Sequence, residues 1–129
     1  GSRIAYTAEI LTNASGEDRI SYAAVVEDVA FTNGEVTPGR PVNLSNRNTL
    51  GDRGPVFSPD GLRVAFWAWD KSYRATLWVA DIDGSNLKQV TNQGFDMYPR
   101  WRPDGKALLF ESGRSGNMDI WSVALAETL

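Results

Sequence analysis

Short apolar runs separated by turn-forming pairs dominate the hydrophobic pattern of this chain. The runs are rich in Val, Ile, Phe, Tyr and Trp, and Asp-Gly, Asn-Gly, Ser-Gly and Pro-Gly pairs separate them. Residues 63–69, 75–80 and 106–110 are apolar at both alternating positions, so strands there are expected to be covered on both faces. The pattern therefore predicts an all-β protein whose sheets stack face to face.

An internal repeat accounts for this spacing. Residues 54–66 align with residues 98–110 at a shift of 44 positions, and a degenerate earlier copy begins at Arg3. The strand centred on Trp78 corresponds to the one centred on Trp121 at a shift of 43. Repeats of roughly 40 to 45 residues that contain four strands each are typical of β-propeller blades.

Each of the two clear repeats contains a Pro-Asp-Gly turn. Proline presets φ for the turn, aspartate caps it and glycine supplies a positive φ, so one strand hairpins into the next. We therefore assign a structural role in these turns to Pro59, Asp60, Gly61, Pro103, Asp104 and Gly105.

The predicted fold is a β-propeller segment of nearly three four-stranded blades in one domain. We expect blade 1 at about residues 3–45, blade 2 at about 54–91 and blade 3 at about 98–129. With strands lettered a to d from the inside outward, the chain reads b, c, d, then a, b, c, d, then a, b, c. Residues 23–39 exceed their counterpart in blade 2 by about sixteen residues, and the Asn33-Gly34 and Pro38-Gly39 pairs predict turns of an extended hairpin within this insert.

The repeat resembles the TolB-type, WD-repeat-like β-propeller repeat. The similarity rests on the aromatic-Ser-Pro-Asp-Gly turn at 57–61, the apolar strand that ends at Phe66, the Asp-Gly turn at 83–84 and Val90-Thr91, and it recurs from Tyr98 onward. Arg102 departs from the pattern, in which serine is usual. This resemblance implies a non-catalytic scaffold that binds proteins in the periplasm or cell envelope. It also leaves open a gating or accessory role in prolyl-oligopeptidase-like or tricorn-like peptidases.

Composition and charge exclude several classes of chemistry. The 129 residues include no His and no Cys, which excludes a Ser-His-Asp triad, cysteine nucleophiles and the usual zinc sites. The net charge of -3 argues against a nucleic-acid partner, and no apolar stretch approaches the length of a membrane span. Residues 81–86 have the composition of a calcium loop, but Asn86 stands where such a loop requires glycine. We expect no enzymatic activity, no metal and no cofactor.

The aspartate, glutamate and tryptophan residues leave open an alternative function, that of a carbohydrate-binding or lyase-type propeller. Asp52, Asp96 and Glu111 could supply paired carboxylates, and Trp67 and Trp69 could supply aromatic platforms. However, Asp52 and Asp96 occupy equivalent repeat positions, which favours a structural role at the entry to strand a. The two tryptophans are expected to fill the space between blades.

The exposed loops hold the predicted recognition residues. In a propeller, the loops between strands d and a and between strands b and c share one face, and exposed loop aromatics and arginine favour protein binding. The predicted partner-binding residues are Tyr73, Arg74, Gln93, Phe95, Asp96 and Met97. Because fewer than three full blades cannot close a propeller, we also expect either a homo-oligomer or a piece of a longer propeller.

Overall fold

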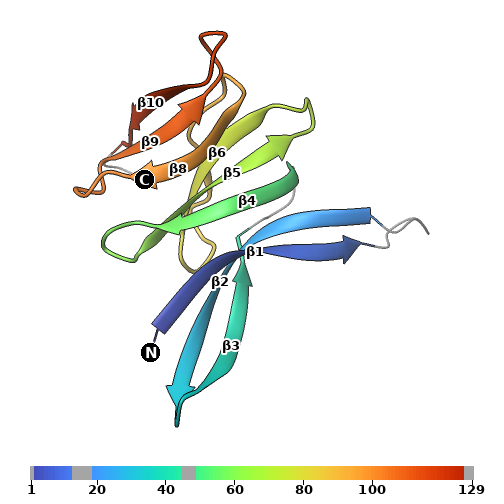
Figure 1. The fold of residues 1–129 in the computed structure, drawn as a ribbon, viewed down its shortest axis with the longest axis vertical. Helices are drawn as coiled ribbons and strands as arrows, with labels where there is room; N and C mark the ends of the chain where they lie inside the picture. Colours follow the sequence, from blue (N-terminus) through green and yellow to red (C-terminus); the bar gives the residue numbers. More distant parts are fainter. Residues whose placement is uncertain (1, 13–18, 45–48, 127–129) are drawn as a thin grey trace.

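The computed structural model describes residues 2–12, 19–44 and 49–126, which form ten β-strands and no helix (Figure 1). The predicted end of blade 1 at Ser45 and the residues from 127 onward lie outside the described residues. The strands are β1 (Ser2–Thr12), β2 (Arg19–Thr32), β3 (Glu35–Asn43), β4 (Thr49–Phe57), β5 (Arg63–Asp70), β6 (Ala75–Asp81), β7 (Lys88–Gln89), β8 (Asp96–Trp101), β9 (Ala107–Ser112) and β10 (Asp119–Ala124).

The strands form three antiparallel sheets that follow one another along the chain. Their orders are β1-β2-β3, β4-β5-β6-β7 and β10-β9-β8, and every neighbouring pair is antiparallel. We call them the first, second and third sheet. This arrangement confirms the predicted fold class, an all-β segment of a propeller. The blade boundaries remain a prediction, and β4 begins at Thr49, five residues before the predicted start of blade 2.

The Pro-Asp-Gly turns connect neighbouring strands within the second and third sheets, and the aspartate of each turn is held by side-chain hydrogen bonds. In the first turn, Ser58 Oγ donates a hydrogen bond to Asp60 Oδ1 at 2.6 Å. Asp60 Oδ1 also accepts a hydrogen bond from the Leu62 N–H at 3.0 Å. The hydrogen bond from Ser58 is the main reason that the pKa of Asp60 lies below its ordinary value. In the third sheet, Arg102 Nη2 donates to Asp104 Oδ2 at 2.9 Å. Arginine can therefore stand in the serine position because it also supplies a donor to the aspartate.

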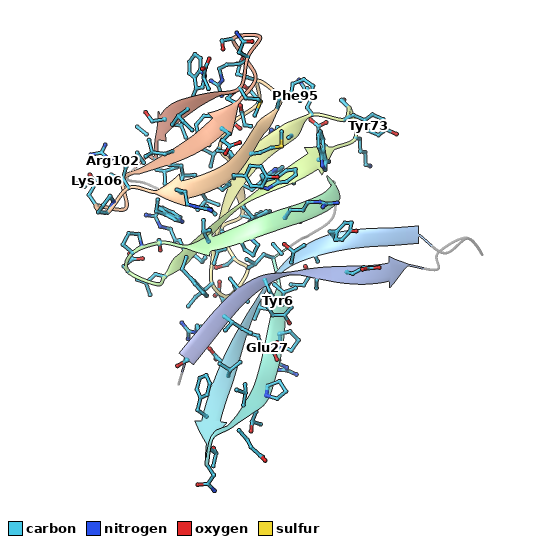
Figure 2. The ribbon with its side chains drawn as sticks, viewed as in Figure 1. Tyr6, Glu27, Tyr73, Phe95, Arg102 and Lys106 are labelled. Atoms are coloured by element: carbon cyan, nitrogen blue, oxygen red, sulfur yellow. The ribbon has the colours of Figure 1, made fainter. Side chains whose placement is uncertain are left out.

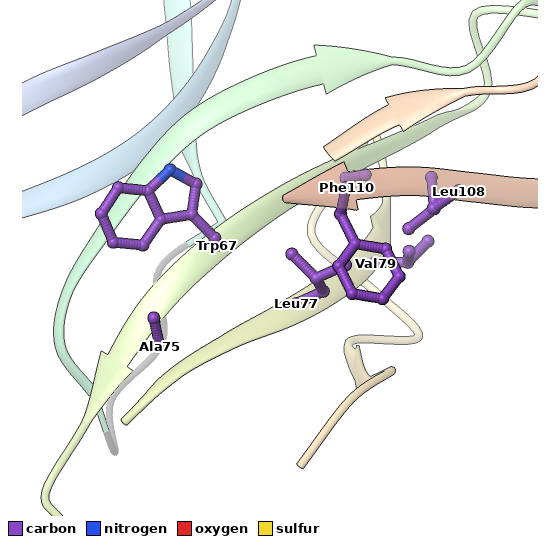
Figure 3. Packing of buried hydrophobic residues seen from close by; sticks show 7 residues of the cluster. Trp67, Ala75, Leu77, Val79, Leu108 and Phe110 are labelled. Carbon is purple, nitrogen blue, oxygen red and sulfur yellow. The ribbon is translucent and has the colours of Figure 1, made fainter. Parts of the chain in front are cut away.

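Two apolar layers hold the three sheets together. One layer joins the first and second sheets and consists of Ala24, Val26, Leu44, Val64, Phe66 and Ala80. The other joins the second and third sheets and consists of Ala65, Trp67, Ala75, Leu77, Val79, Leu108 and Phe110 (Figure 3). Alternate residues of β5 enter opposite layers, because successive side chains of a strand point to opposite faces. This explains why residues 63–69 are apolar at both positions.

The insert in the first sheet extends the β2–β3 hairpin away from the rest of the molecule (Figure 1). The turn at Asn33 and Gly34 has φ values of 54° and 81°, as the predicted Asn-Gly turn requires. Phe31 lies opposite Val36 near the tip, and both side chains are exposed. Pro38 and Gly39 lie within β3, the outermost strand, so the turn predicted at this pair is wrong, and Pro38 instead removes one backbone donor from that edge. Residues 23–39 therefore belong to an ordered hairpin.

Candidate interaction surface

Three turns meet at one end of the second and third sheets. They are the β5–β6 turn, the β7–β8 loop and the β9–β10 turn, and we call residues 70–74, 90–95 and 113–118 the loop face. Gly94 lies against the Arg74 side chain, because a Cβ atom at Gly94 would be 3.4 Å from Arg74 Cγ. Gly113 donates its N–H to the Phe95 carbonyl at 3.2 Å, which joins the loop to the third turn. The predicted loops are thus packed against one another.

The loop face exposes three large apolar side chains. Tyr73 and Phe95 both lie at this end of the molecule (Figure 2). Tyr73 is 74% exposed, and Phe95 and Met118 are each 52% exposed. Phe95 and Met118 flank Gly113, where a Cβ atom would lie 3.4 Å from Phe95 Cβ and 3.2 Å from Met118 Sδ. The tyrosine and the phenylalanine are of the residue types that dominate binding energy at protein interfaces, and methionine adapts to irregular surfaces.

Sequence reasoning missed Met118, although the signal was present. Met118 lies between the second and third strands of its blade, as Tyr73 does in the preceding blade. The rule that placed Tyr73 on the recognition face therefore applies equally to Met118. The four predicted residues that the structure places on this surface are Tyr73, Arg74, Gln93 and Phe95.

Asp96 is buried and Met97 is half-buried, so neither belongs to the exposed surface of the loop face. Both belong to β8, which begins directly after the loop. Asp96 is fully buried, where its carboxylate accepts hydrogen bonds from Ser112 Oγ at 2.5 Å and Arg114 Nη2 at 3.0 Å. Met97 is half-buried and packs on the apolar layer between the second and third sheets. Asp96 and Met97 therefore stabilise the residues next to the loop face and do not form its exposed surface.

Arg114 connects this buried carboxylate to the aromatic residues of the third sheet. Its guanidinium carbon lies 4.8 Å from the centre of the Trp121 ring and 5.2 Å from the centre of the Phe110 ring. The Arg114 Nε–H also donates to Ser112 Oγ at 2.9 Å. Arginine above aromatic faces gains a cation–π attraction in addition to its ion pair. Arg114 thereby fixes the β9–β10 turn that carries Met118.

Tyr73 and Phe95 both have left-handed backbone conformations. Each has a φ of 58°, which is uncommon for aromatic residues. Such conformations cost free energy, persist only where surrounding contacts impose them and concentrate at functional sites. At Tyr73 the contacts are those of Asp70, whose carbonyl accepts the Tyr73 N–H at 3.0 Å. The hydrogen bond to Asp70 thus holds the backbone of Tyr73 in this conformation, and the side chain of Tyr73 remains exposed.

Asp70 organises the turn through its ionised carboxylate. The carboxylate accepts the backbone N–H groups of Ser72 and Arg74 at 2.8 and 2.9 Å and the Arg74 Nε–H at 3.3 Å. Burial raises the pKa of Asp70, but the two backbone hydrogen bonds and the positive charge of Arg74 outweigh burial, so this pKa lies below its ordinary value of 3.8.

The lowered pKa of Asp70 gives a prediction about pH. Because the folded pKa is below the unfolded one, the stabilisation is fully present above pH 3.8 and is lost as pH falls through the folded pKa. Asp70→Ala is expected to lower the free energy of unfolding by about 1 kcal/mol at pH 7. Urea denaturation of both proteins measures this, and the difference should shrink below pH 3.8. A difference that stays constant into strong acid would contradict the role of the ionised carboxylate.

Of the alternative carboxylates, Glu111 is exposed in β9, whereas Asp52 and Asp96 lie in the interior, and the two tryptophans are engaged in packing. Asp52 is 2% exposed, and the Asp96 carboxylate is bonded to Ser112 and Arg114. Trp67 is 5% exposed and Trp69 packs beside it, so these rings fill the space between blades as expected. Within residues 2–12, 19–44 and 49–126, no cluster of three acidic side chains could hold a metal ion.

Two known proteins are similar in sequence to this chain. The chain is 33% identical over 109 residues, 78% of its length, to dipeptidyl-peptidase 5 of Porphyromonas gingivalis. It is 41% identical over 49 residues, 36% of its length, to the Tol-Pal system protein TolB of Rhizorhabdus wittichii. No protein-family model matches the chain.

Among solved structures, a putative TolB from Agrobacterium tumefaciens superposes with a TM-score of 0.60 over 79% of this chain, at 24% identity. The chain has the TolB-type β-propeller fold. It spans 15% of the dipeptidyl-peptidase, 11% of the Rhizorhabdus TolB and 38% of the Agrobacterium chain. In this TolB-type segment, the loop face lies at the ends of strands from two neighbouring sheets, where turns from successive blades meet.

Proposed function

We propose that this TolB-type segment is a non-catalytic scaffold that binds a protein partner through its loop face. The observation that carries the proposal is the set of exposed side chains Tyr73, Phe95 and Met118 on three turns that are packed together. Aromatic side chains have few rotatable bonds and therefore lose little conformational entropy on binding, which favours affinity. The likeness to TolB proteins supports a location in the periplasm or cell envelope.

Electrostatics at the loop face are compatible with a protein partner and give no support to nucleic acid. The whole chain has a net charge of -3. The positive charges of Arg74 and Arg114 are paired with Asp70 and Asp96, at 3.3 and 3.0 Å. No helix in the described part of the chain is long and apolar enough to cross a membrane.

Two substitutions test the loop face. Phe95→Ala and Arg74→Ala should each weaken partner binding about tenfold or more, because each removes exposed contact area from the centre of the surface. The immobilised chain is used to capture proteins from the envelope fraction of the source cells, and the affinity of the captured protein is then measured by titration calorimetry.

The matched control for these variants is Phe31→Ala, which removes an exposed aromatic ring from the tip of the β2–β3 hairpin. All three variants should retain the wild-type melting temperature. If Phe95→Ala and Arg74→Ala bind the partner as tightly as the wild type does, the loop face is not the binding surface.

A second candidate function is that of a gating or accessory propeller piece of a peptidase. The 33% identity to dipeptidyl-peptidase 5 favours it specifically. In that case catalysis would belong to another domain, since the chain contains no histidine. Sequencing the gene on both sides tests this candidate: a Gly-x-Ser-x-Gly motif followed by Asp and His in the same reading frame would favour the peptidase. Further propeller blades alone would favour the scaffold.

A further inference from the structure

The tip of the β2–β3 hairpin holds the one Asn-Gly pair of the sequence, Asn33-Gly34. Thr32 pairs with Glu35, so Asn33 and Gly34 alone form the loop between the two strands. This loop lies at the far end of the hairpin that extends away from the other sheets (Figure 1). Both loop residues are exposed. Solvent therefore has direct access to the asparagine side chain and to the peptide bond that follows it.

Few contacts hold this loop in place. In the described part of the chain, neither the Asn33 side chain nor the Gly34 N–H takes part in a hydrogen bond. A Cβ atom at Gly34 would have no other atom within 4 Å, so nothing shields the Gly34 nitrogen. The flanking pair, Phe31 and Val36, is 64% and 57% exposed. Because so little surface is buried around the loop, local opening of the tip costs little free energy.

The other asparagines that the structure describes outside the strands are in less open settings. Asn86 also has a left-handed backbone, with a φ of 52°, but its Nδ2 donates a hydrogen bond to Asp81 Oδ2 at 2.8 Å. The residue after it is Leu87, whose branched side chain stands beside the following peptide nitrogen. Asn92 and Asn117 precede Gln93 and Met118, which also have long side chains. Asn33 therefore combines an unrestrained amide with an unshielded neighbouring nitrogen.

We propose that Asn33 deamidates in the folded protein, through attack of the Gly34 backbone nitrogen on the Asn33 side-chain amide. The nitrogen loses its proton to solvent base and forms a bond to Asn33 Cγ. The Cγ–Nδ2 bond then breaks, and the amide nitrogen takes a proton from water and leaves as ammonia. Water opens the resulting succinimide at either carbonyl carbon, which yields aspartate or isoaspartate. The net reaction consumes water, releases ammonia and involves no oxidation or reduction.

Deamidation changes the hairpin tip in charge and in backbone length. The new carboxylate lowers the net charge of -3 by one, and it stands two residues before Glu35, next to the exposed pair of Phe31 and Val36. Isoaspartate also adds a methylene group to the main chain. A two-residue loop cannot absorb this group without a change in the pairing of Thr32 with Glu35, because loop length and turn type fix the register of a hairpin.

Incubation of the purified chain at mildly alkaline pH, followed by proteolysis and mass spectrometry, tests the proposal. The peptide that contains residue 33 should gain the mass difference between an amide and a carboxylic acid, and chromatography should resolve its aspartate and isoaspartate forms. The rate should rise roughly tenfold per pH unit, because the fraction of deprotonated peptide nitrogen does so. The peptides that contain Asn86, Asn92 and Asn117 should keep their amides over the same period.

Two variants complete the test. Asn33→Gly should abolish the acidic form of the intact chain, and its Gly-Gly pair still suits the two-residue loop. Phe66→Ala alters the layer between the first and second sheets and should convert at Asn33 at the wild-type rate, because the tip opens without unfolding of that layer. Retention of the Asn33 amide, or conversion no faster than at Asn117, would overturn the proposal. So would faster conversion in Phe66→Ala, which would assign the reaction to the unfolded chain.

Discussion

Phe66→Ala is expected to lower the free energy of unfolding by about 3–5 kcal/mol, as is typical when a buried phenylalanine is truncated. Phe66 is 1% exposed and lies in the layer between the first and second sheets, with Val26 and Leu44 in the same layer. The cost combines lost burial of the ring with the cavity that remains, since backbone hydrogen bonding within two sheets limits collapse around it.

Urea denaturation followed by tryptophan fluorescence measures the effect of Phe66→Ala. The control is Phe31→Ala, because Phe31 is 64% exposed on the β2–β3 hairpin and its truncation should change the free energy of unfolding by no more than about 0.5 kcal/mol. If the two variants lose similar stability, Phe66 does not join the first and second sheets as described.

The second large effect is expected at Asp96. Asp96→Ala should lower the free energy of unfolding by about 2–4 kcal/mol, because it leaves Ser112 and Arg114 without their shared acceptor. The expected loss in the free energy of unfolding is no larger because the Arg114 side chain is 23% exposed and can still form hydrogen bonds with water. The hydroxyl group of Ser112 is fully buried and cannot form a hydrogen bond with water in this way.

The Asp96 variant should also affect the loop face. Without the carboxylate, Arg114 loses its anchor, and the β9–β10 turn that carries Met118 becomes more mobile. Hydrogen exchange of the amides in residues 113–118 should therefore accelerate in Asp96→Ala more than in the second sheet. The control is Asp28→Ala, which removes a surface ion pair to Arg3 and should cost less than about 1 kcal/mol. Equal effects of the two variants would contradict the buried role of Asp96.

Much of the fold was predictable because it depends on local chemistry repeated along the chain. Pro-Asp-Gly at residues 59–61 and 103–105 imposes hairpin turns, and strands that are apolar at both alternating positions require sheets on both sides. The Asn-Gly pair at 33–34 similarly indicated the long β2–β3 hairpin. These features need only neighbouring residues and the two-residue period of a strand.

The recognition surface was less predictable because exposure depends on where a strand begins. Phe95 and Asp96 are adjacent in sequence, yet the side chain of Phe95 is 52% exposed and that of Asp96 is fully buried. The β8 strand begins at Asp96, and pairing with β9 turns its side chain toward Ser112. The loop position of Met118 was readable from the repeat, but its place beside Phe95 depends on packing across Gly113.

The sequence by itself determined the all-β class, the repeat length and the turns, because backbone preference and hydrophobic period act locally. Only the tertiary structure decided which loop residues are exposed and which carboxylate is enclosed. These properties depend on contacts between residues far apart in the chain, such as Arg114 with Asp96, and no local pattern encodes their geometry.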